Sequence, residues 1–401
     1  MAIQTVCPDV FEVGASHPER EMFDAFMPIP MGTTYNSYLI NGEKANCLID
    51  PVDPEKLHVL LANLKEAGVE TLDYVVCLHT EQDHSGTLPD LISRWPDIKI
   101  VAMKKVQELI GTHLHIPAER IQVMEEGESL DLGGKTLRFH AIPFAHWPDN
   151  TAAYLVEDDI LFSSDLFGSH YASPEIFSTD SNDQRMAARQ YYAEIMMPFR
   201  KQVARHVEWT KKLNPRHIAP SHGPIWYDTS KILQMYESWT SDEVKKKVVI
   251  GYVSMHGSVE TMVEKYAVRL APPGLSVVCR NIAAHPDSLT REVGNLAADM
   301  VDAAAVVIAT PTVVVGPHPS AMYLAAVVNV LKPKSRYFQF LGSFGWASQA
   351  PQGIASALSN FRGEALEPIN VKGLPTEDEI EAIQEAADKM AEKILADPLV
   401  K

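Results

Sequence analysis

The chain has 401 residues, of which 46% are hydrophobic and 22% are charged, as is typical of globular proteins with two or three domains. Its formal charge of −17 argues against a nucleic-acid-binding surface, which requires a basic stripe. No apolar run reaches the roughly 20 residues that span a bilayer, and the N-terminus lacks a signal-peptide pattern. We therefore expect a cytoplasmic protein without nucleic-acid or membrane partners.

The four cysteines give no sign of a structural framework. Cys7, Cys47, Cys77 and Cys279 have no C-x-x-C spacing, which excludes a zinc ribbon and does not suggest disulfides.

In the N-terminal part of the chain, short apolar runs alternate with turn signals and helical stretches. Strands are predicted at 38–40, 47–50, 74–78, 98–102, 136–142, 153–156 and 159–163, and a helix at 57–67. Long helices are predicted within 183–213. They should end at Asn214-Pro215, because proline forbids continuation of a helix. Mixed strands with interspersed helices predict an α/β sandwich.

The pattern changes after the charged stretch 241–247. The continuous apolar strands predicted at 248–253, 276–280, 304–309 and 337–341 are each followed by a loop and a helical segment, which indicates a doubly wound parallel sheet. Residues 376–397 carry apolar residues at helical spacing and are predicted to form a terminal amphipathic helix. We place the first domain at 1–247 and the second at 248–401.

The segment His79-Thr80-Glu81-Gln82-Asp83-His84 offers four potential metal ligands directly after a predicted strand. Since alternate side chains share one face of a strand, we expect His79, Glu81 and Asp83 to converge on one point. Two imidazoles with two carboxylates form a more oxygen-rich set than is usual for zinc, which favours iron or manganese. The alternative is a polar turn that binds no metal.

Three more candidate ligands, His146, Asp165 and His222, lie where predicted strands end. Taken singly, each has a structural explanation: a histidine near proline is commonly a hydrogen-bonded surface residue, and an aspartate after Ser-Ser commonly caps a helix. Together they could complete a binuclear site, in which one carboxylate bridges two ions about 3.5–4 Å apart.

The ordered set of His79, Glu81, Asp83, His84, His146, Asp165 and His222 resembles the metallo-β-lactamase-like domain of flavodiiron proteins, also called A-type flavoproteins. Supporting matches are Met31-Gly32-Thr33-Thr34-Tyr35-Asn36-Ser37-Tyr38-Leu39, His146-Trp147-Pro148-Asp149, Ser164-Asp165-Leu166-Phe167-Gly168 and Pro220-Ser221-His222-Gly223-Pro224-Ile225-Trp226. Zinc hydrolases of that superfamily carry histidine at the position of Glu81. The resemblance implies that one iron is held by His79, Glu81 and His146 and the other by Asp83 and His222, with Asp165 bridging. Family members differ in whether the imidazole of His84 reaches the second iron.

Loops after three strands of the second domain are similar to the FMN site of flavodoxins. The first of them opens a helix, whose N-terminus can hold a phosphate, although a lone Ser-rich loop would by itself be an ordinary helix cap. The residues implied are Ser254, Met255, His256, Gly257, Ser258 and Val259; Pro311, Thr312, Val313, Val314 and Gly316; and Ser343, Phe344, Gly345 and Trp346. Because His256, Val259 and Val313 replace the polar residues that are common in relatives, we expect backbone amides to supply much of the phosphate cradle.

The resemblance implies an oxidoreductase that reduces dioxygen to water, or nitric oxide to nitrous oxide, at a non-haem diiron centre fed by FMN. It further implies a separate electron donor, such as rubredoxin or a reduced deazaflavin, and a head-to-tail homodimer or a dimer of dimers. Tyr191, Tyr192, His170 and Phe144 are candidates to line the pocket. The alternatives are a binuclear zinc hydrolase on the same fold and a flavodoxin-like electron carrier, which metal analysis with a visible spectrum would distinguish.

Overall fold

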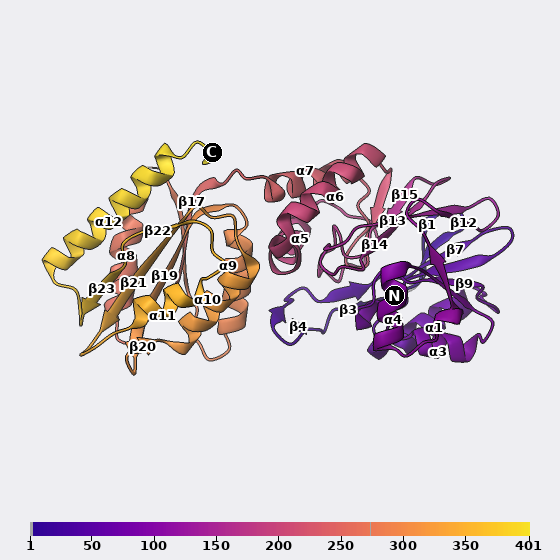
Figure 1. The fold of residues 1–401 in the computed structure, drawn as a ribbon, viewed down its shortest axis with the longest axis horizontal. Coiled ribbons are helices and arrows are strands. Elements are labelled where there is room, and N and C mark those ends of the chain that lie inside the picture. The colour runs from indigo at the N-terminus through magenta and orange to yellow at the C-terminus, as the bar shows by residue number, and fades with distance from the viewer. Residues whose placement is uncertain (1–2, 273) are drawn as a thin grey trace. The chain divides into compact units, whose positions relative to one another are not determined.

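The computed structural model describes residues 3–272 and 274–401, which form two compact units (Figure 1). The first unit contains the residues up to Phe23, Ile29–Tyr192 and Phe199–Glu237, and the second contains Asp24–Pro28, Ala193–Pro198 and Ser238–Lys401. The division expected at residue 247 lies within strand β17 (Lys245–Tyr252). A domain boundary at that residue stays a prediction.

Two β-sheets form the centre of the first unit. The first has the order β1 (Gln4–Cys7), β2 (Val10–Glu12), β7 (Tyr38–Asn41), β8 (Asn46–Ile49), β9 (Tyr74–Val76), β10 (Lys99–Met103), β11 (Ile121–Met124). The second has the order β12 (Ser129–Asp131), β13 (Thr136–Ala141), β14 (Thr151–Leu155), β15 (Ile160–Phe162), β16 (His217–Ala219). Strands β3 (Ala15–His17) and β6 (Thr33–Tyr35) form a separate antiparallel ribbon, and β4 spans Met22–Phe23. The predicted strands are therefore present, with ends shifted by up to two residues.

The two sheets share one hydrophobic core because the strands of both contribute buried apolar side chains to it. Ile40, Val76 and Val101 of the first sheet belong to the same buried cluster as Phe139 and Phe162 of the second, as in a sandwich of two sheets. Helices α1 (Leu57–Glu66), α3 (Leu88–Arg94) and α4 (Lys104–His113) lie beside the first sheet, and α5 (Asn182–Tyr191) and α6 (Arg200–Leu213) beside the second (Figure 1). The first unit is therefore an αββα sandwich of two sheets with helices on its outer faces, as the resemblance predicted.

The long helical stretch predicted at 183–213 is interrupted. A π-helical turn at Tyr192–Met196 and a 3-10 turn at Met197–Phe199 separate α5 from α6. Pro198 lies at the break and has no backbone N–H to donate to a continuous α-helix. As predicted, α6 ends before Asn214, which adopts the left-handed conformation with φ of 52°. The remaining elements are η1 (Pro54–Lys56), α2 (Gln82–Ser85), η2 (Ala118–Arg120) and α7 (Thr229–Thr240).

The second unit is the predicted doubly wound sheet. Its strands have the order β18 (Ser276–Asn281), β17, β19 (Ala303–Val313), β21 (Tyr337–Phe344) and β22 (Glu364–Ala365), all parallel, which is the flavodoxin-like arrangement. Strand β23 (Ile369–Lys372) also pairs with β21, β20 (Gly316–Pro317) pairs with β19, and β5 spans Met27–Pro28. Helices α8 (Ser258–Leu270) and α12 (Glu377–Ala396) pack together, and the others are α9 (Leu289–Met300), α10 (Pro319–Leu331) and α11 (Ala350–Ala357).

Two details of the second unit bear on the sequence predictions. The terminal helix is confirmed: α12 begins after Thr376, which forms a capping box with Glu379. The segments expected to be loops at 310 and 342 are instead strand ends, because the parallel pairing of β19 with β21 continues through Thr310–Gly342 and Pro311–Ser343.

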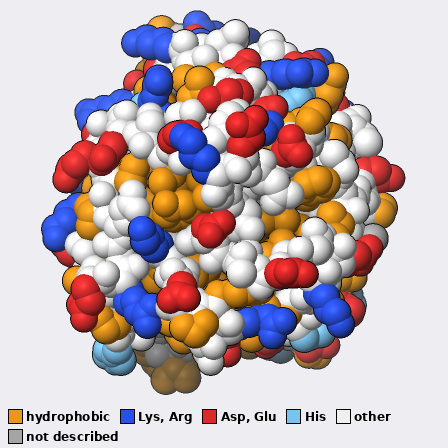
Figure 2. Space-filling model, turned by 90° about the vertical axis from the view of Figure 1, so that its right-hand side faces the viewer, with side chains coloured by type: hydrophobic (Ala, Val, Ile, Leu, Met, Phe, Trp, Pro, Cys, Tyr) orange, Lys and Arg blue, Asp and Glu red, His pale blue; other side chains and the backbone are white. Residues whose placement is uncertain are grey.

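The face of the molecule drawn in Figure 2 carries charged side chains of both signs. On this face, lysine and arginine side chains are interspersed with aspartate and glutamate. Within the described ranges, none of the helices has the length and apolar character needed to cross a bilayer.

One carboxyl group lies in the first unit's interior. Glu12, at the end of β2, is 2% exposed, and its Oε1 accepts a hydrogen bond of 2.8 Å from the backbone N–H of Gly14. Its Oε2 is buried without a hydrogen-bond partner among the described residues. Burial raises the pKa of Glu12 to about 7, and the Gly14 bond only partly opposes this. The folded state therefore favours the protonated acid.

The raised pKa predicts a pH dependence of stability that Glu12→Gln should remove. The Glu12 contribution is fully present below the unfolded pKa near 4.5 and is lost as the pH rises through about 7. Between pH 4.5 and 8 the wild type should lose about 3 kcal/mol of unfolding free energy relative to the variant. Urea denaturation of the first unit at both pH values measures this difference. Exposed Glu66→Gln is the control, and a pH-independent difference for Glu12→Gln would contradict the prediction.

Candidate metal centre

The chain changes conformation within the segment that was expected to be an extended metal-binding strand. Strand β9 ends at Val76, and the short helix α2 begins at Gln82. A helix rotates successive side chains by about 100° rather than 180°. Asp83 lies in a different group of candidate ligands from His79 and Glu81, so the expectation that these three side chains meet at one point is wrong.

The structure gathers all seven predicted residues into two adjacent clusters. His79, Glu81, His146 and Asp165 form the first, and Asp83, His84 and His222 form the second. Within each cluster the candidate ligand atoms lie within 4.8 Å of one another. His84, whose participation varies among family members, lies in the second cluster, with Nε2 at 3.5 Å from Oδ2 of Asp83.

Asp165 joins the two clusters through its two carboxylate oxygens. Oδ2 lies 3.3 Å from Nε2 of His146 and 3.5 Å from Nε2 of His79. Oδ1 lies 3.1 Å from Nε2 of His84 and 3.5 Å from Nε2 of His222. One oxygen directed at each cluster is the arrangement of a carboxylate that bridges two metal ions.

The three candidate ligands outside the segment 79–84 lie in loops that follow strands. Asp165 follows β15 by three residues, His222 follows β16 by three, and His146 lies in the loop after β13. Strands β15 and β16 are paired in parallel, so their carboxyl ends lie at the same edge of the second sheet. The sheet therefore fixes the loops that carry Asp165 and His222 close together.

The hydrogen bonding of the clusters fits metal ions. Both carboxylate oxygens of Asp83 and Oδ2 of Asp165 are buried, and no described residue donates a hydrogen bond to them. Buried carboxylate oxygens without donors are costly unless a cation compensates them. The set of imidazoles and carboxylates matches the ligands of non-haem iron and manganese.

The pKa shifts within the clusters are also consistent with bound metal ions. Burial by itself would raise the pKa of Asp165, but the imidazoles of His84, His146 and His79 lower it well below its usual range. Burial would lower the pKa of His146, but Asp165 and Glu81 raise it to about 10. Metal ions would take the place of the protons that otherwise balance these carboxylates, so metal binding releases protons.

Two carboxylates that orient the imidazoles had been assigned no role from the sequence. Oδ2 of Asp149 lies 3.1 Å from Nδ1 of His79 and accepts bonds from Thr80 N at 2.9 Å and Thr80 Oγ1 at 2.7 Å. Asp50 lies behind His84, with Oδ2 at 3.8 Å from Nδ1. Such partners fix the orientation of metal-binding imidazoles. The sequence offered one signal for each of them: Asp50 ends the strand predicted at 47–50, and Asp149 belongs to the same motif as the candidate ligand His146.

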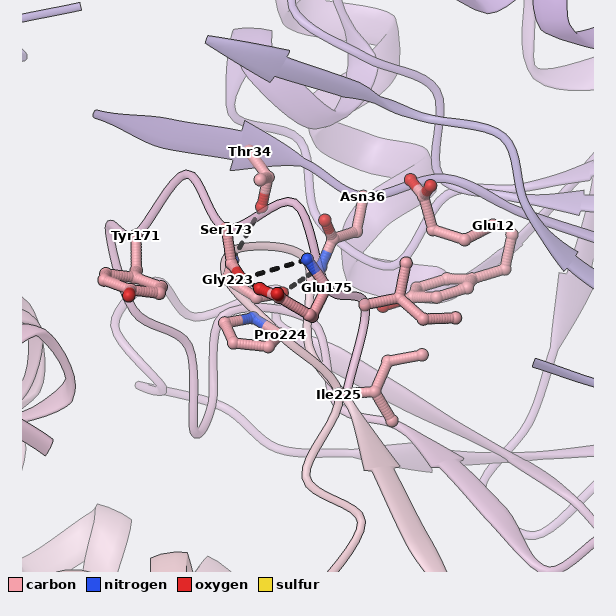
Figure 3. Close-up of a pocket in the computed structure, with 11 residues that line it drawn as sticks. Glu12, Thr34, Asn36, Tyr171, Ser173, Glu175, Gly223, Pro224 and Ile225 are labelled. Carbon is pink, nitrogen blue, oxygen red and sulfur yellow. Dashed lines mark hydrogen bonds between the residues drawn. The ribbon is translucent and has the colours of Figure 1, made fainter. Parts of the chain in front are cut away.

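The segment 34–38 holds the loop that carries His222. Nδ1 of His222 donates to the carbonyl oxygen of Thr34 at 2.6 Å, and Gly223 N donates to Thr34 Oγ1 at 2.7 Å. Nδ2 of Asn36 donates to the carbonyls of Pro220 at 2.8 Å and Gly223 at 2.6 Å, and Figure 3 shows Thr34 and Asn36 turned towards Gly223. A Cβ at Gly223, which has φ of +76°, would lie 2.1 Å from Ser169 Oγ, so glycine is required here.

Aromatic rings surround the imidazole of His222. The ring centroids of His170, Phe23, Tyr35 and Tyr191 lie 5.2, 5.8, 6.0 and 6.1 Å from it. Tyr191 also donates from its hydroxyl to Oδ1 of Asp165 at 3.1 Å. The second cluster is therefore walled by aromatic rings, whose polar atoms are the Tyr35 and Tyr191 hydroxyls and the His170 imidazole.

Two other candidates for the pocket lining make ring contacts of their own. The Tyr192 ring packs against Tyr236, and the Phe144 ring stacks on Phe199; that these two side chains line the pocket stays a prediction.

The three segments with predicted cofactor contacts lie at one edge of the second unit's sheet. They follow or end the neighbouring strands β17, β19 and β21. Ser343 Oγ donates to Ser258 Oγ at 3.2 Å, which joins the third segment to the first, and Thr312 Oγ1 lies 2.8 Å from Oγ of Ser348, two residues beyond the third segment. Val259 has a side chain in the hydrophobic core, so only its backbone amide can face a ligand.

This edge has the features of an anion and ring site. Helix α8 starts after Gly257, which has φ of 87°, and no side chain caps its N-terminus. Met255, Val314 and Trp346, one from each segment, are among the exposed large hydrophobic residues. Open helix amides with exposed apolar side chains fit a phosphate joined to a flat aromatic ring system.

Asp149→Asn should weaken metal binding in the first cluster. The amide keeps the shape of Asp149 but loses the charge beside Nδ1 of His79, and loss of such a partner lowers metal affinity by about 10- to 100-fold. Competition with a chelator, followed by metal analysis, measures the change. Asp131→Asn, which breaks the exposed pair with Lys44, is the control, and equal affinity in the two variants would refute the orienting role of Asp149.

Comparisons with known proteins extend these observations. The family model described as "ODP family beta lactamase" matches residues 33–223. The coenzyme F420H(2) oxidase of Methanothermobacter marburgensis is 33% identical over 377 residues, which cover 90% of this chain and 92% of that protein. The structure of rubredoxin oxygen:oxidoreductase from Desulfovibrio gigas aligns with a TM-score of 0.92 at 30% identity, covering 98% of this chain and 99% of that one. The flavodiiron protein from Giardia intestinalis aligns with a TM-score of 0.91 at 25% identity, covering 99% and 97%.

Proposed function

Because this chain belongs to the flavodiiron protein family, we propose that it is an oxidoreductase that reduces dioxygen to water, or nitric oxide to nitrous oxide. The observation that carries the proposal is Asp165, whose two oxygens face two separate ligand clusters. When bound, a pair of irons would supply open coordination positions and electrons for the gas, and FMN would supply the electrons that restore the irons.

The chain's own residues would hold and orient these groups. His79, Glu81 and His146 would bind one iron, Asp83, His84 and His222 the other, and Asp165 both. Asp149 and the Thr34 carbonyl would fix the rings of His79 and His222 through their Nδ1 atoms. Helix α8 would hold the FMN phosphate at its N-terminus, and Trp346 would cover the flavin ring.

The wall around His222 supports a small uncharged gas as substrate. Phe23, Tyr35, His170 and Tyr191 present rings to it, so this side offers little to recognise a polar ester or amide. The alternative of a binuclear zinc hydrolase is disfavoured, because Glu81 adds a carboxylate to the first cluster and a flavodoxin-like unit would have no role in hydrolysis.

The electron donor and assembly belong to the same proposal. A separate donor, rubredoxin or reduced F420, would deliver electrons to FMN, as the names of the similar proteins suggest. We further propose that the protein forms a head-to-tail homodimer in the cytoplasm. The seven residues named above would be the iron ligands, and the domain boundary would lie near residue 247.

Gas consumption tests the proposed reaction. Protein loaded with iron and FMN should consume dioxygen or nitric oxide only when a reduced donor is added. Asp165→Ala should retain FMN but lose activity by more than the roughly 100-fold expected from losing an outer hydrogen-bond partner. Oxygen and nitric oxide electrodes measure both rates, and Asp158→Ala, which breaks the pair with Lys135, is the control. Zinc without flavin, or loaded protein inert to both gases, would exclude the proposal.

Trp346→Ala tests the flavin position. The side chain is 74% exposed, so its removal should leave stability unchanged while weakening FMN binding by about 10-fold, as expected for lost ring stacking. Fluorescence titration of the apoprotein with FMN measures the dissociation constant. Val268→Ala removes another exposed apolar side chain, on α8, and should bind FMN as the wild type does. Unchanged affinity in Trp346→Ala would show that this ring does not cover the flavin.

A further inference from the structure

Arg20 belongs to neither ligand cluster, yet its guanidinium connects several segments near His222. Nη1 donates to the Tyr35 hydroxyl at 2.8 Å and lies 3.4 Å from Oδ2 of Asp53. Nε donates to the carbonyl of Met22 at 3.1 Å. The guanidinium carbon also lies 5.2 Å from the centroid of the Phe23 ring, within the range of a cation–π contact.

The two rings that Arg20 contacts both meet the imidazole of His222. The Phe23 and Tyr35 rings approach it edge-on, at interplanar angles of 76° and 73°. Tyr35 also follows Thr34, whose carbonyl accepts the bond from Nδ1 of His222. Arg20 is therefore linked to this imidazole through ring packing and through the backbone of β6.

The anchor of Arg20 is itself held in place. Asp53 accepts a bond of 2.9 Å from Glu55 N and caps the turn η1. The side chains of Arg20 and Asp53 are 25% and 13% exposed. A fully exposed ion pair would contribute little, but this one is partly shielded from solvent and joins the turn η1 to the segment that follows β3.

We propose that Arg20 is a positioning residue for the second ligand cluster: it holds Tyr35 and Phe23 against His222, so that the imidazole keeps the orientation needed to bind metal with Asp83 and His84. The inference rests on the proposed function in that the metal is iron. A residue that only stabilised the fold would change the melting temperature without changing the metal centre.

Four variants test this inference. Arg20→Met keeps much of the length but loses donors and charge, Arg20→Lys keeps the charge and donors, and Tyr35→Phe removes the hydroxyl that accepts from Arg20. The matched control is Arg94→Met, since Arg94 lies over the Trp95 ring at 5.3 Å and contacts neither cluster among the described interactions. The readouts are iron release from the reduced, FMN-loaded protein to a chelator and the electron paramagnetic resonance spectrum of the half-oxidised iron pair.

Arg20→Met should release one of its two irons at least about threefold faster than the wild type, a smaller effect than loss of a direct ligand partner, and should show an altered spectrum. Tyr35→Phe should shift both readouts in the same direction, and Arg20→Lys should recover at least half of the difference. Arg94→Met should match the wild type.

Any one of three results would overturn the inference: identical release and spectra for Arg20→Met and the wild type, no recovery with lysine, or equal acceleration in Arg94→Met. A wild-type protein that holds no iron would instead contradict the proposed function. Failure of the inference about Arg20 can therefore be distinguished from failure of the proposed function.

Discussion

The structure of the first unit depends on the balance of charge among side chains buried at its strand ends. Three carboxylates and four imidazoles lie within two adjacent clusters, and all of them except Glu81 and His146 are buried. Such a set is tolerated only when its members neutralise one another or share cations. Asp165 contributes to both clusters, so the two halves of the site cannot be considered separately.

The surrounding elements keep this arrangement rigid. The paired strands β15 and β16 set the spacing between the loops that carry Asp165 and His222. The segment 34–38 binds the loop of His222 through backbone and side-chain hydrogen bonds, and Asp149 fixes His79 from the other side. Because His79 and His222 are held through Nδ1, which faces away from their clusters, Nε2 of each ring is directed towards the metal position.

The second unit provides a different kind of site on its own sheet. Three neighbouring parallel strands bring their carboxyl ends to one edge, as in other doubly wound folds where ligands bind. An uncapped helix N-terminus and exposed apolar side chains lie at that edge. A polar, buried metal site and an open phosphate and ring site are complementary in an enzyme that takes up electrons at one and uses them at the other.

The sequence alone determined much of this. Apolar periodicity located the long central strands of the sheets and the terminal helix, because their apolar side chains are buried at regular spacing. It did not locate shorter strands such as β1, β2 and β16. The spacing of His79 to His84, together with His146, Asp165 and His222, was enough to name the candidate metal site. Strand alternation alone would place His79, Glu81 and Asp83 together, and only the resemblance to flavodiiron proteins implied their division between two clusters, because the chain enters α2 at Gln82.

Only the tertiary structure decided which residues support the site. Asp50, Asp149 and Arg20 lie from tens of residues to well over a hundred residues away from some of the side chains they orient, and no local pattern encodes those contacts. The break at Pro198 and the extension of β19 and β21 were also decided by packing and strand pairing. Sequence periodicity records which face of an element is buried, whereas the partners across that face are set by how the sheets and loops come together.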